Sequence, residues 1–196
     1  MVYGRGWPDR GPFRSKLGPH IDRVLPGHLG LCVDAGVRFL LVDHNTAFAA
    51  DYLKALPDAV VINRNWSHEE RSYSGDPDEA AEAWAAPRSD GAARASGCDL
   101  TRLYWMGVNE PPVGTRAERQ WVAAFERARL HLLEQRGLKA ALFAFSVGTP
   151  ALEVWGEFHA ALEAAHRGSH MLCLHEYFGR QAHDLWQGTW GYLCGR

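Results

Sequence analysis

The residues best suited to chemistry stand together in the segment Tyr104 to Pro111, at the end of an apolar run. The run from Leu103 to Val108 has the composition of a buried strand, and Asn109 and Glu110 follow it directly. A parallel barrel forms its active site at the C-terminal ends of its strands. A glutamate held at such a rim, beside an asparagine, is suited to general-acid catalysis on a glycosidic oxygen.

Other apolar runs of the chain also end in polar or aromatic residues. The residues at the ends of these runs are His20, the triplet Asp43, His44 and Asn45, the segment Asn63 to Trp66, Ser146 and Val147, and the group His175, Glu176 and Tyr177. Trp66, Trp186 and Trp190 fall in predicted loops near the same end, where flat aromatic faces can stack on a sugar ring. The alternative for each tryptophan is simple loop packing.

Short apolar runs alternate with helical patterns along the chain. Strands are predicted at 18–21, 37–42, 59–62, 103–108, 140–145 and 171–174, and helices at 24–35, 47–56, around 80–84, from Thr115 to 136, and from Thr149-Pro150 to 168. Strands that are apolar on both faces and alternate with amphipathic helices indicate a parallel sheet in an α/β protein.

Two parallel architectures compete: an open doubly wound sheet and a (β/α)8 barrel of the TIM type. A doubly wound sheet usually binds a phosphate through a glycine-rich turn after its first strand, and no such turn follows residues 18–21. The sequence therefore favours the barrel, with about six of its eight βα units, over residues 18–196 after an N-terminal extension of residues 1–17. A complete barrel takes about 250 residues, so we expect a fragment, or less simply a sheet that a partner chain closes.

Composition excludes several classes of function. The formal net charge of −2 provides no basic surface for nucleic acid. No apolar run approaches the length of a membrane helix, and residues 1–16 do not have the pattern of a secretory signal, so the compartment stays open. The four cysteines form no C-x-x-C pair, which argues against a zinc ribbon. Cys32 and Cys173 are expected in the core.

On these residues the chain resembles the retaining glycoside hydrolases that carry two catalytic glutamates on a (β/α)8 barrel. Asn109-Glu110-Pro111 after the fourth strand carries the resemblance, and residues His20, Asp43, His44, Asn45, His175 and Tyr177 support it. The resemblance covers about residues 18–177. It implies that Glu110 is the acid/base and that Asn109 hydrogen-bonds the sugar 2-hydroxyl. It places His175 and Tyr177 beside the nucleophile or the sugar.

The resemblance also implies a nucleophile, a second glutamate at the end of a seventh strand, which the sequence does not contain. Retention needs that carboxylate at about 5–5.5 Å from the first. Glu176 is a poor substitute, because side chains alternate along a strand and it would point away if His175 and Tyr177 face the mouth. We therefore expect an inactive or impaired chain at this length, with an active intact parent.

Each candidate has a structural alternative. Glu110 could complement a helix dipole, although Pro111-Pro112 disfavours a helix start there. His20 could be a buried, hydrogen-bonded histidine, and Asn45 could cap the following helix. Trp105, Trp121 and Trp155 stand inside predicted elements and are expected in the core.

Three functions follow from this pattern. The first is a glycosidase domain acting on an oligo- or polysaccharide, with Glu110 as acid and with Asn109, His20, Asp43, Asn45, Trp66, His175, Tyr177 and Trp186 as substrate contacts. It needs no cofactor and no metal. The second is a non-catalytic carbohydrate-binding relative. The third is a metal-dependent hydrolase using His20, His44, Glu110 and His175, which ranks low because the first strand lacks a second histidine.

Overall fold

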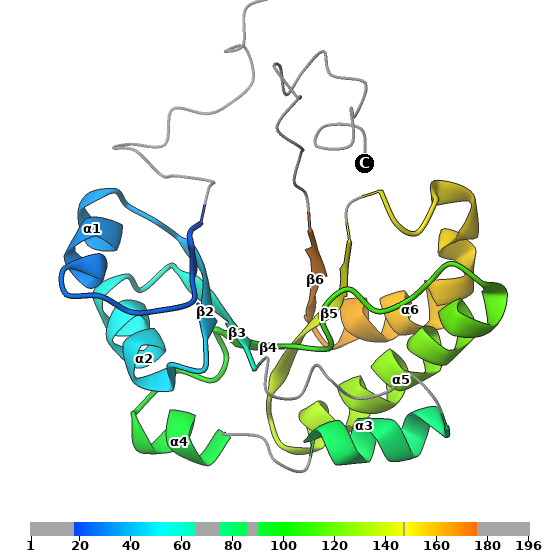
Figure 1. Cartoon of the computed structure of the whole chain (residues 1–196). Coiled ribbons are helices and arrows are strands. Elements are labelled where there is room, and N and C mark those ends of the chain that lie inside the picture. Colours follow the sequence, from blue (N-terminus) through cyan, green and yellow to red (C-terminus); the bar gives the residue numbers. More distant parts are fainter. Residues whose placement is uncertain (1–17, 66–74, 86–89, 147, 176–196) are drawn as a thin grey trace, which may run out of the picture.

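The computed structural model describes residues 18–65, 75–85, 90–146 and 148–175, and its strands form one parallel sheet. The strands are β1 (His20–Ile21), β2 (Phe39–Asp43), β3 (Val60–Arg64), β4 (Leu103–Met106), β5 (Lys139–Phe145) and β6 (Met171–Leu174). They lie in chain order, β1 to β6, and every neighbouring pair is parallel. A doubly wound sheet reverses its order at a switch point; this sheet does not, and it curls into a half-barrel (Figure 1).

Helices follow the strands and cover the outside of the curl. They are α1 (His28–Asp34), α2 (Thr46–Ala55), α3 (Pro77–Ala85), α4 (Asp90–Ala95), α5 (Arg116–Gln135), the 3-10 helix η2 (Leu152–Phe158) and α6 (His159–Arg167). Figure 1 shows α1 and α2 on one flank, and α5 and α6 on the other. In the described part of the chain, no helix combines the length and apolarity that a bilayer crossing requires.

Local signals start two of the longer helices where the sequence predicted them. Thr115 and Glu118 form the reciprocal capping box of α5, with the Thr115 backbone N–H donating to the Glu118 carboxylate at 2.7 Å. The Asp76 carboxylate accepts the backbone N–H groups of Asp78 and Glu79 at 2.8 and 3.1 Å. Both devices satisfy N–H groups that a helix start leaves without partners.

The two faces of the sheet bury different apolar clusters because side chains alternate along each strand. Leu40, Val61 and Leu103 belong to the cluster that packs under the helices. A smaller cluster on the inner, concave face contains Ile62, Met106, Ala141, Ala144 and Cys173. The C-terminal ends of the strands that carry this inner cluster hold the candidate site residues.

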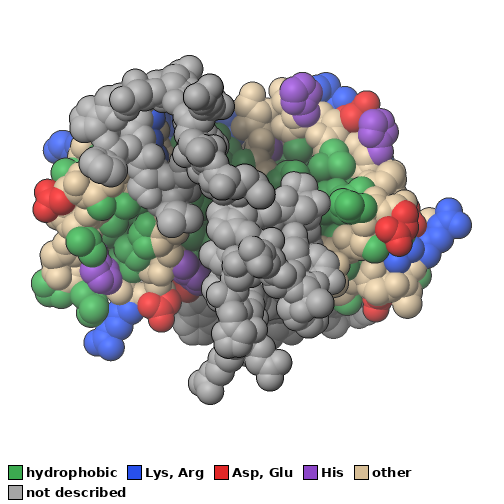
Figure 2. Space-filling view, turned by 90° about the horizontal axis from the view of Figure 1, so that it is seen from above, with side chains coloured by type: hydrophobic (Ala, Val, Ile, Leu, Met, Phe, Trp, Pro, Cys, Tyr) green, Lys and Arg blue, Asp and Glu red, His purple; other side chains and the backbone are tan. Residues whose placement is uncertain are grey.

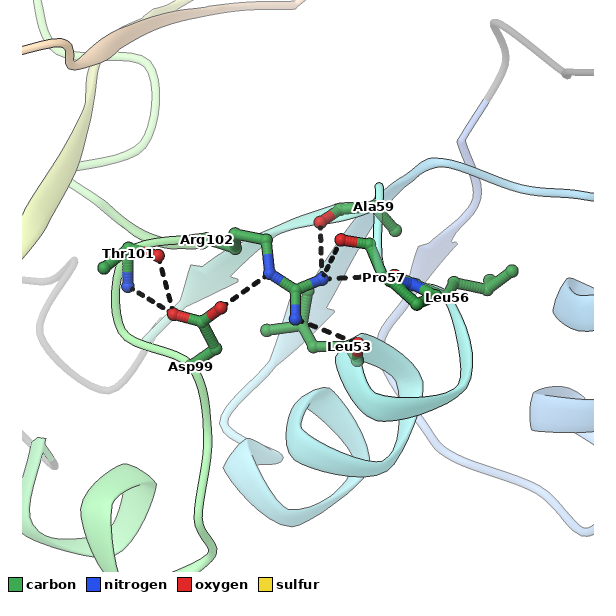
Figure 3. A network of polar contacts seen from close by, with 7 residues as sticks. All are labelled: Leu53, Leu56, Pro57, Ala59, Asp99, Thr101 and Arg102. Carbon is green, nitrogen blue, oxygen red and sulfur yellow. Dashed lines mark hydrogen bonds and ion pairs between the residues drawn. The ribbon is translucent and has the colours of Figure 1, made fainter.

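The opposite end of the sheet is closed by a polar network around Arg102, which precedes β4 (Figure 3). Its guanidinium donates to the carbonyl oxygens of Leu53 at 3.0 Å and Pro57 at 2.8 Å, and to the Asp99 carboxylate at 2.7 Å. These carbonyls belong to the C-terminal end of α2 and the turn after it. Hydrogen bonds from Thr101 and then from Arg102 hold the pKa of Asp99 below its usual value. This end of the fold serves stability.

Three local predictions were wrong. The α1 helix begins at His28, where Gly27 is the N-cap, four residues later than expected. Helix α4 was not predicted at all, because its six residues include glycine and follow a proline. Thr149-Pro150 does not cap a helix: its peptide bond is cis, and the chain runs into η2 through Ala151, which makes no side-chain cap.

The buried face of α5 also differs from the predicted one. Trp121, Ala128 and Leu132 pack against the core while only partly buried. The buried residues of the helix are Val122, Phe125, Glu126, Arg129, Leu130 and Leu133. The helix therefore turns two charged residues toward the sheet.

Candidate functional site

Glu110 and His175 come together where β4 and β6 end. Nδ1 of His175 lies 2.9 Å from Oε1 of Glu110, and the two side chains are 21% and 34% exposed in that order. The residues are 65 positions apart in the chain. His175 follows Cys173 by two residues, so strand alternation directs it to the inner face. The sequence placed both residues at one end of the sheet, and the structure brings them into contact.

The backbones of both partners are attached to β5, which lies between β4 and β6. The N–H of Glu110 donates to the carbonyl of Ala144, and the N–H of His175 donates to the carbonyl of Phe145, each at 2.9 Å. Glu110 has a φ of 46°, a left-handed conformation that a non-glycine residue adopts at a cost. The glutamate is therefore held in place by its backbone as well as by its side chain.

The contact between carboxyl and imidazole can accommodate either protonation state of the glutamate. An ionised Glu110 accepts a hydrogen bond from the Nδ1–H of His175, and a protonated Glu110 can donate one to Nδ1 of the other tautomer. A partner that can reverse its hydrogen bond in this way suits a group that alternates between acid and base. Burial raises the pKa of the neighbouring Cys173 thiol to about 11, so that thiol stays neutral beneath the pair.

A second histidine–carboxylate pair lies on β1 and β2, toward the opposite edge of the sheet. Nε2 of His20 lies 3.3 Å from Oδ1 of Asp43, with side chains 46% and 7% exposed. The two residues lie on the neighbouring strands β1 and β2. His20 of β1 pairs with Leu41 of β2, and Asp43 of β2 pairs with Arg64 of β3. β3 stands between β2 and β4 in the sheet, so this pair and the Glu110–His175 pair flank it.

The other described candidates have simpler positions. Oδ1 of Asn45 accepts the backbone N–H of Phe48 at 2.8 Å, so Asn45 caps α2, the alternative that the sequence offered. Its sugar contact stays a prediction. Asn109 is partly buried next to Glu110, and His44 is exposed with a φ of 55°. Trp66, Tyr177 and Trp186, together with Glu176 and Trp190, lie outside the described residues.

Of the five predicted core residues, three are buried and two are partly buried. Trp105 is 1% exposed, and Trp121 and Trp155 pack against the main core while partly buried. Cys32 and Cys173 are buried free thiols. None of these five therefore competes with Glu110 for a functional role.

The described residues provide little for a metal ion. Among residues 18–65, 75–85, 90–146 and 148–175, no three histidine, cysteine or acidic side chains are arranged to hold one. Two of the histidines proposed as ligands, His20 and His175, instead contact different carboxylates on different sides of β3. The metal-dependent alternative gains no support from this part of the chain.

A cavity of about 640 Å3 lies away from the strand ends, between α3, α5 and α6. Its walls include acidic residues such as Glu82 and Glu163 and basic residues such as Arg127 and Arg167. Charges of both signs on three outer helices select no particular ligand. The strand-end pairs remain the better candidate site. Seen from above (Figure 2), histidine, acidic and apolar side chains are exposed on both flanks of the molecule.

Sequence reasoning missed two buried charged residues of α5, which contact the backbone of β4 and β5. Glu126 and Arg129 are almost fully buried, and the backbone N–H of Phe143 donates to Glu126 at 3.2 Å. A signal was present in the sequence. Val122, Phe125 and Leu130 define an apolar stripe at helical spacing, and the two charges fall inside it. Charges within such a stripe indicate a buried ion pair.

Comparisons with known proteins identify no relative: no family model, no curated protein and no solved structure matches this chain.

Proposed function

We propose that Glu110 is the acid/base of a glycoside hydrolase site on a (β/α)8-type barrel, of which the six described strands form the larger part. The observation that carries the proposal is the contact between Glu110 and His175, at 2.9 Å, at the C-terminal end of a parallel sheet. The side chain of Glu110 is 34% exposed, so it is accessible to a ligand. The substrate class is an oligo- or polysaccharide.

In this proposal Oε2 of Glu110 carries a proton and donates it to the oxygen of the leaving sugar as the glycosidic bond breaks. Oε1 accepts the Nδ1–H of His175 before and after this transfer, and the carboxylate later takes a proton from the attacking water. Asn109 hydrogen-bonds the sugar 2-hydroxyl, as the resemblance to two-glutamate glycosidases implies. A retaining reaction also needs a nucleophilic carboxylate about 5–5.5 Å from Glu110, and we assign that role to no described residue.

One observation favours a second candidate, a carbohydrate-binding protein without turnover. Asp43 is the other carboxylate that the sequence placed at this end, and it is hydrogen-bonded to His20 on the far side of β3. A site in which Glu110 has no second carboxylate beside it among the described residues can bind a sugar without cleaving it. Calorimetry against a panel of oligosaccharides, combined with a turnover assay, separates the two candidates.

The acid role is tested with aryl glycosides whose leaving groups differ in acidity. The assay uses the whole chain and, where the reading frame continues, the longer product. Glu110→Gln should lower kcat/KM for poor leaving groups by about 10²–10⁴-fold and should have much less effect on dinitrophenyl glycosides, which need no acid. Glu163→Gln on α6, whose side chain is 54% exposed, is the matched control and should behave as the parent.

Undiminished hydrolysis of poor leaving groups by Glu110→Gln would refute the acid role. Sugar binding without turnover by both products would establish the binding candidate instead. A protein that neither binds nor cleaves any member of the panel would remove both.

A further inference from the structure

The buried ion pair of α5 is unusual in being almost completely removed from water. The side chains of Arg129 and Glu126 are 0% and 2% exposed, and Arg129 Nε lies 2.8 Å from Glu126 Oε2. The guanidinium carbon also lies 4.8 Å from the centre of the Trp84 ring. Burying two charges in this way is often no more stable than an apolar replacement. A role beyond stability is therefore worth seeking.

The remaining hydrogen bonds of the pair go to the backbone of β4 and β5. Arg129 donates to the carbonyls of Trp105 and Ala141, both at 3.0 Å. Oε1 of Glu126 accepts the N–H of Phe143 at 3.2 Å. The pair thus joins the two strands from the helix side.

Space for this arrangement depends on a glycine at the end of β4. A Cβ added to Gly107 would lie 2.8 Å from Oε1 of Glu126 and 3.1 Å from Cζ of Arg129. Gly107 stands three residues before Glu110. The strand that carries the candidate acid therefore passes directly against the buried carboxylate.

At Phe143, β5 departs from a regular strand. The pairing of β5 with β6 shifts register between Phe143 and Phe145, and Phe143 and Ala144 have φ values of 76° and 40°. Such a bulge leaves a backbone group outside the ladder and uses conformations that cost free energy. The N–H of Phe143 finds its partner in Glu126, so the carboxylate stabilises the bulge at its first residue.

The bulge decides which carbonyls face the candidate site. Ala144 accepts the N–H of Glu110, and Phe145, the next residue, accepts the N–H of His175. In a regular strand, successive carbonyls point to opposite neighbours under a fixed register, and a one-residue slip reverses every orientation. The position of the bulge therefore sets the position of both partners.

We propose that Glu126 and Arg129 are positioning residues for the Glu110–His175 pair, acting through the bulge of β5. The pair holds Phe143, the bulge presents the carbonyls of Ala144 and Phe145, and these hold the two site residues at contact distance. The effect of this positioning on catalysis rests on the proposed function. The geometric coupling itself can be tested without any substrate.

Amide hydrogen exchange of the whole, free chain is the first measurement. The exchange rates of the Glu110 and His175 amides are compared with that of Val60, whose N–H donates to Arg38 on the far side of the sheet. In Glu126→Leu both rates should rise about tenfold or more relative to Val60, because local opening raises exchange only where bonds are lost. Glu126→Gln keeps an oxygen for Phe143 and should show a smaller rise.

Arg102→Met is the matched control, since it breaks an arginine–carbonyl network at the other end of the sheet. Because Arg102 also donates to the carbonyl of Ala59, next to Val60, this variant should raise the exchange rate of Val60 and leave the Glu110 and His175 rates within about twofold of the parent. If Glu126→Leu changes all three rates by the same factor, or changes none of them, the coupling does not exist. Should Glu126→Leu not fold, Gly107→Ala makes the same test, because its added methyl displaces the carboxylate.

The second measurement is the tautomer of His175, read from a long-range ¹⁵N spectrum at about pH 8. A carboxylate only accepts, so the parent should carry the proton on Nδ1. Glu126→Leu should give a mixture of tautomers, as should Glu110→Ala, which removes the partner. An Nδ1–H signal retained in Glu126→Leu would overturn the inference. If both responses appear, but neither this chain nor its longer product binds or hydrolyses any glycoside, the proposed function is refuted and the positioning role stays intact.

Discussion

The half-barrel carries two histidine–carboxylate pairs at one end, and they are held in different ways. His20 and Asp43 lie on adjacent strands in regular register, 3.3 Å apart. Glu110 and His175 come from strands that are not neighbours, and they meet at 2.9 Å above β5. The first pair follows directly from β1 lying beside β2. The second requires the strand between its members to be bulged.

The difference also appears in the backbone. Glu110 has a left-handed φ, and its backbone N–H donates to the carbonyl of Ala144 in β5. Asp43, in contrast, is the last residue of a regular strand. Strained residues that a surrounding network holds in place are typical of functional sites. The two sides differ in which residue is strained: on the β4–β6 side it is the paired carboxylate itself, and on the β1–β2 side it is His44, which follows Asp43.

The largest effect should come from breaking the support of the β4–β6 side. Arg129→Met leaves Glu126 buried without its partner, which costs about 3–5 kcal/mol in the free energy of unfolding. Arg119→Met, which removes the more exposed bridge between α5 and Glu157, should cost about 1 kcal/mol. Urea denaturation of both variants measures the two losses. Equal losses would show that the buried pair stabilises the fold no more than the exposed bridge does.

Glycine and alanine scans should have opposite outcomes at the two carboxylates. At Glu110, Gly should be more stable than Ala by about 1 kcal/mol, because glycine adopts the left-handed conformation freely. At Asp43, Ala should be more stable than Gly by about 0.5–1 kcal/mol, because that backbone is extended. Both replacements lose the side-chain contact, so the comparison isolates the backbone. The same preference at both positions would contradict a strained Glu110.

Mild acid should weaken the β6 side through His170. Burial lowers the pKa of His170, whose Nδ1 accepts the N–H of Ala140 at 2.9 Å and whose Nε2 faces Glu134. The unfolded chain then binds the proton more readily than the folded one. Stability is present above the ordinary histidine value of about 6.5 and falls as the pH drops from there toward the folded pKa.

His170→Gln should remove that dependence on pH. Thermal melts between about pH 7.5 and 5 compare it with His166→Gln, an exposed histidine of the same helix end. A parent protein whose melting temperature stays level through this range, or a variant that keeps the slope, would exclude His170 as the responsible group.

The smallest effect is expected on the β1–β2 side. His20→Ala should cost about 0.5 kcal/mol or less, since the imidazole is 46% exposed and an exposed ion pair contributes little. Chemical denaturation at neutral pH measures it. A loss above about 2 kcal/mol would mean that this pair is more than a surface contact.

Much of the fold could be predicted from the sequence because its signals are local. The β6 bounds of 171–174 agree with the prediction, and the Thr115 capping box starts α5 as expected. Apolar runs alternating with helical periods gave a parallel α/β sheet. Polar residues directly after those runs placed Glu110 and His175 at one end, because parallel strands end on the same side.

What the sequence could not provide depends on non-local contacts. The composition of Lys139–Phe145 does not indicate a bulge, since six of its seven residues are apolar and all six are buried, as in a regular core strand. At the bulge, a carboxylate on a helix accepts the N–H of Phe143. Likewise, the sequence pattern predicted a buried face of α5 that is displaced by one residue from the face that is buried. The reason is that Glu126 and Arg129 form an ion pair and are buried with the apolar residues.

The order of residues by itself determined that this chain forms parallel strands with polar ends, and that a glutamate stands at one of those ends. Tertiary structure alone decided which histidine the glutamate meets and in what backbone conformation it is held. The physical reason is that hydrophobic periodicity acts within one element, whereas a hydrogen bond between distant strands depends on the register of the strands between them.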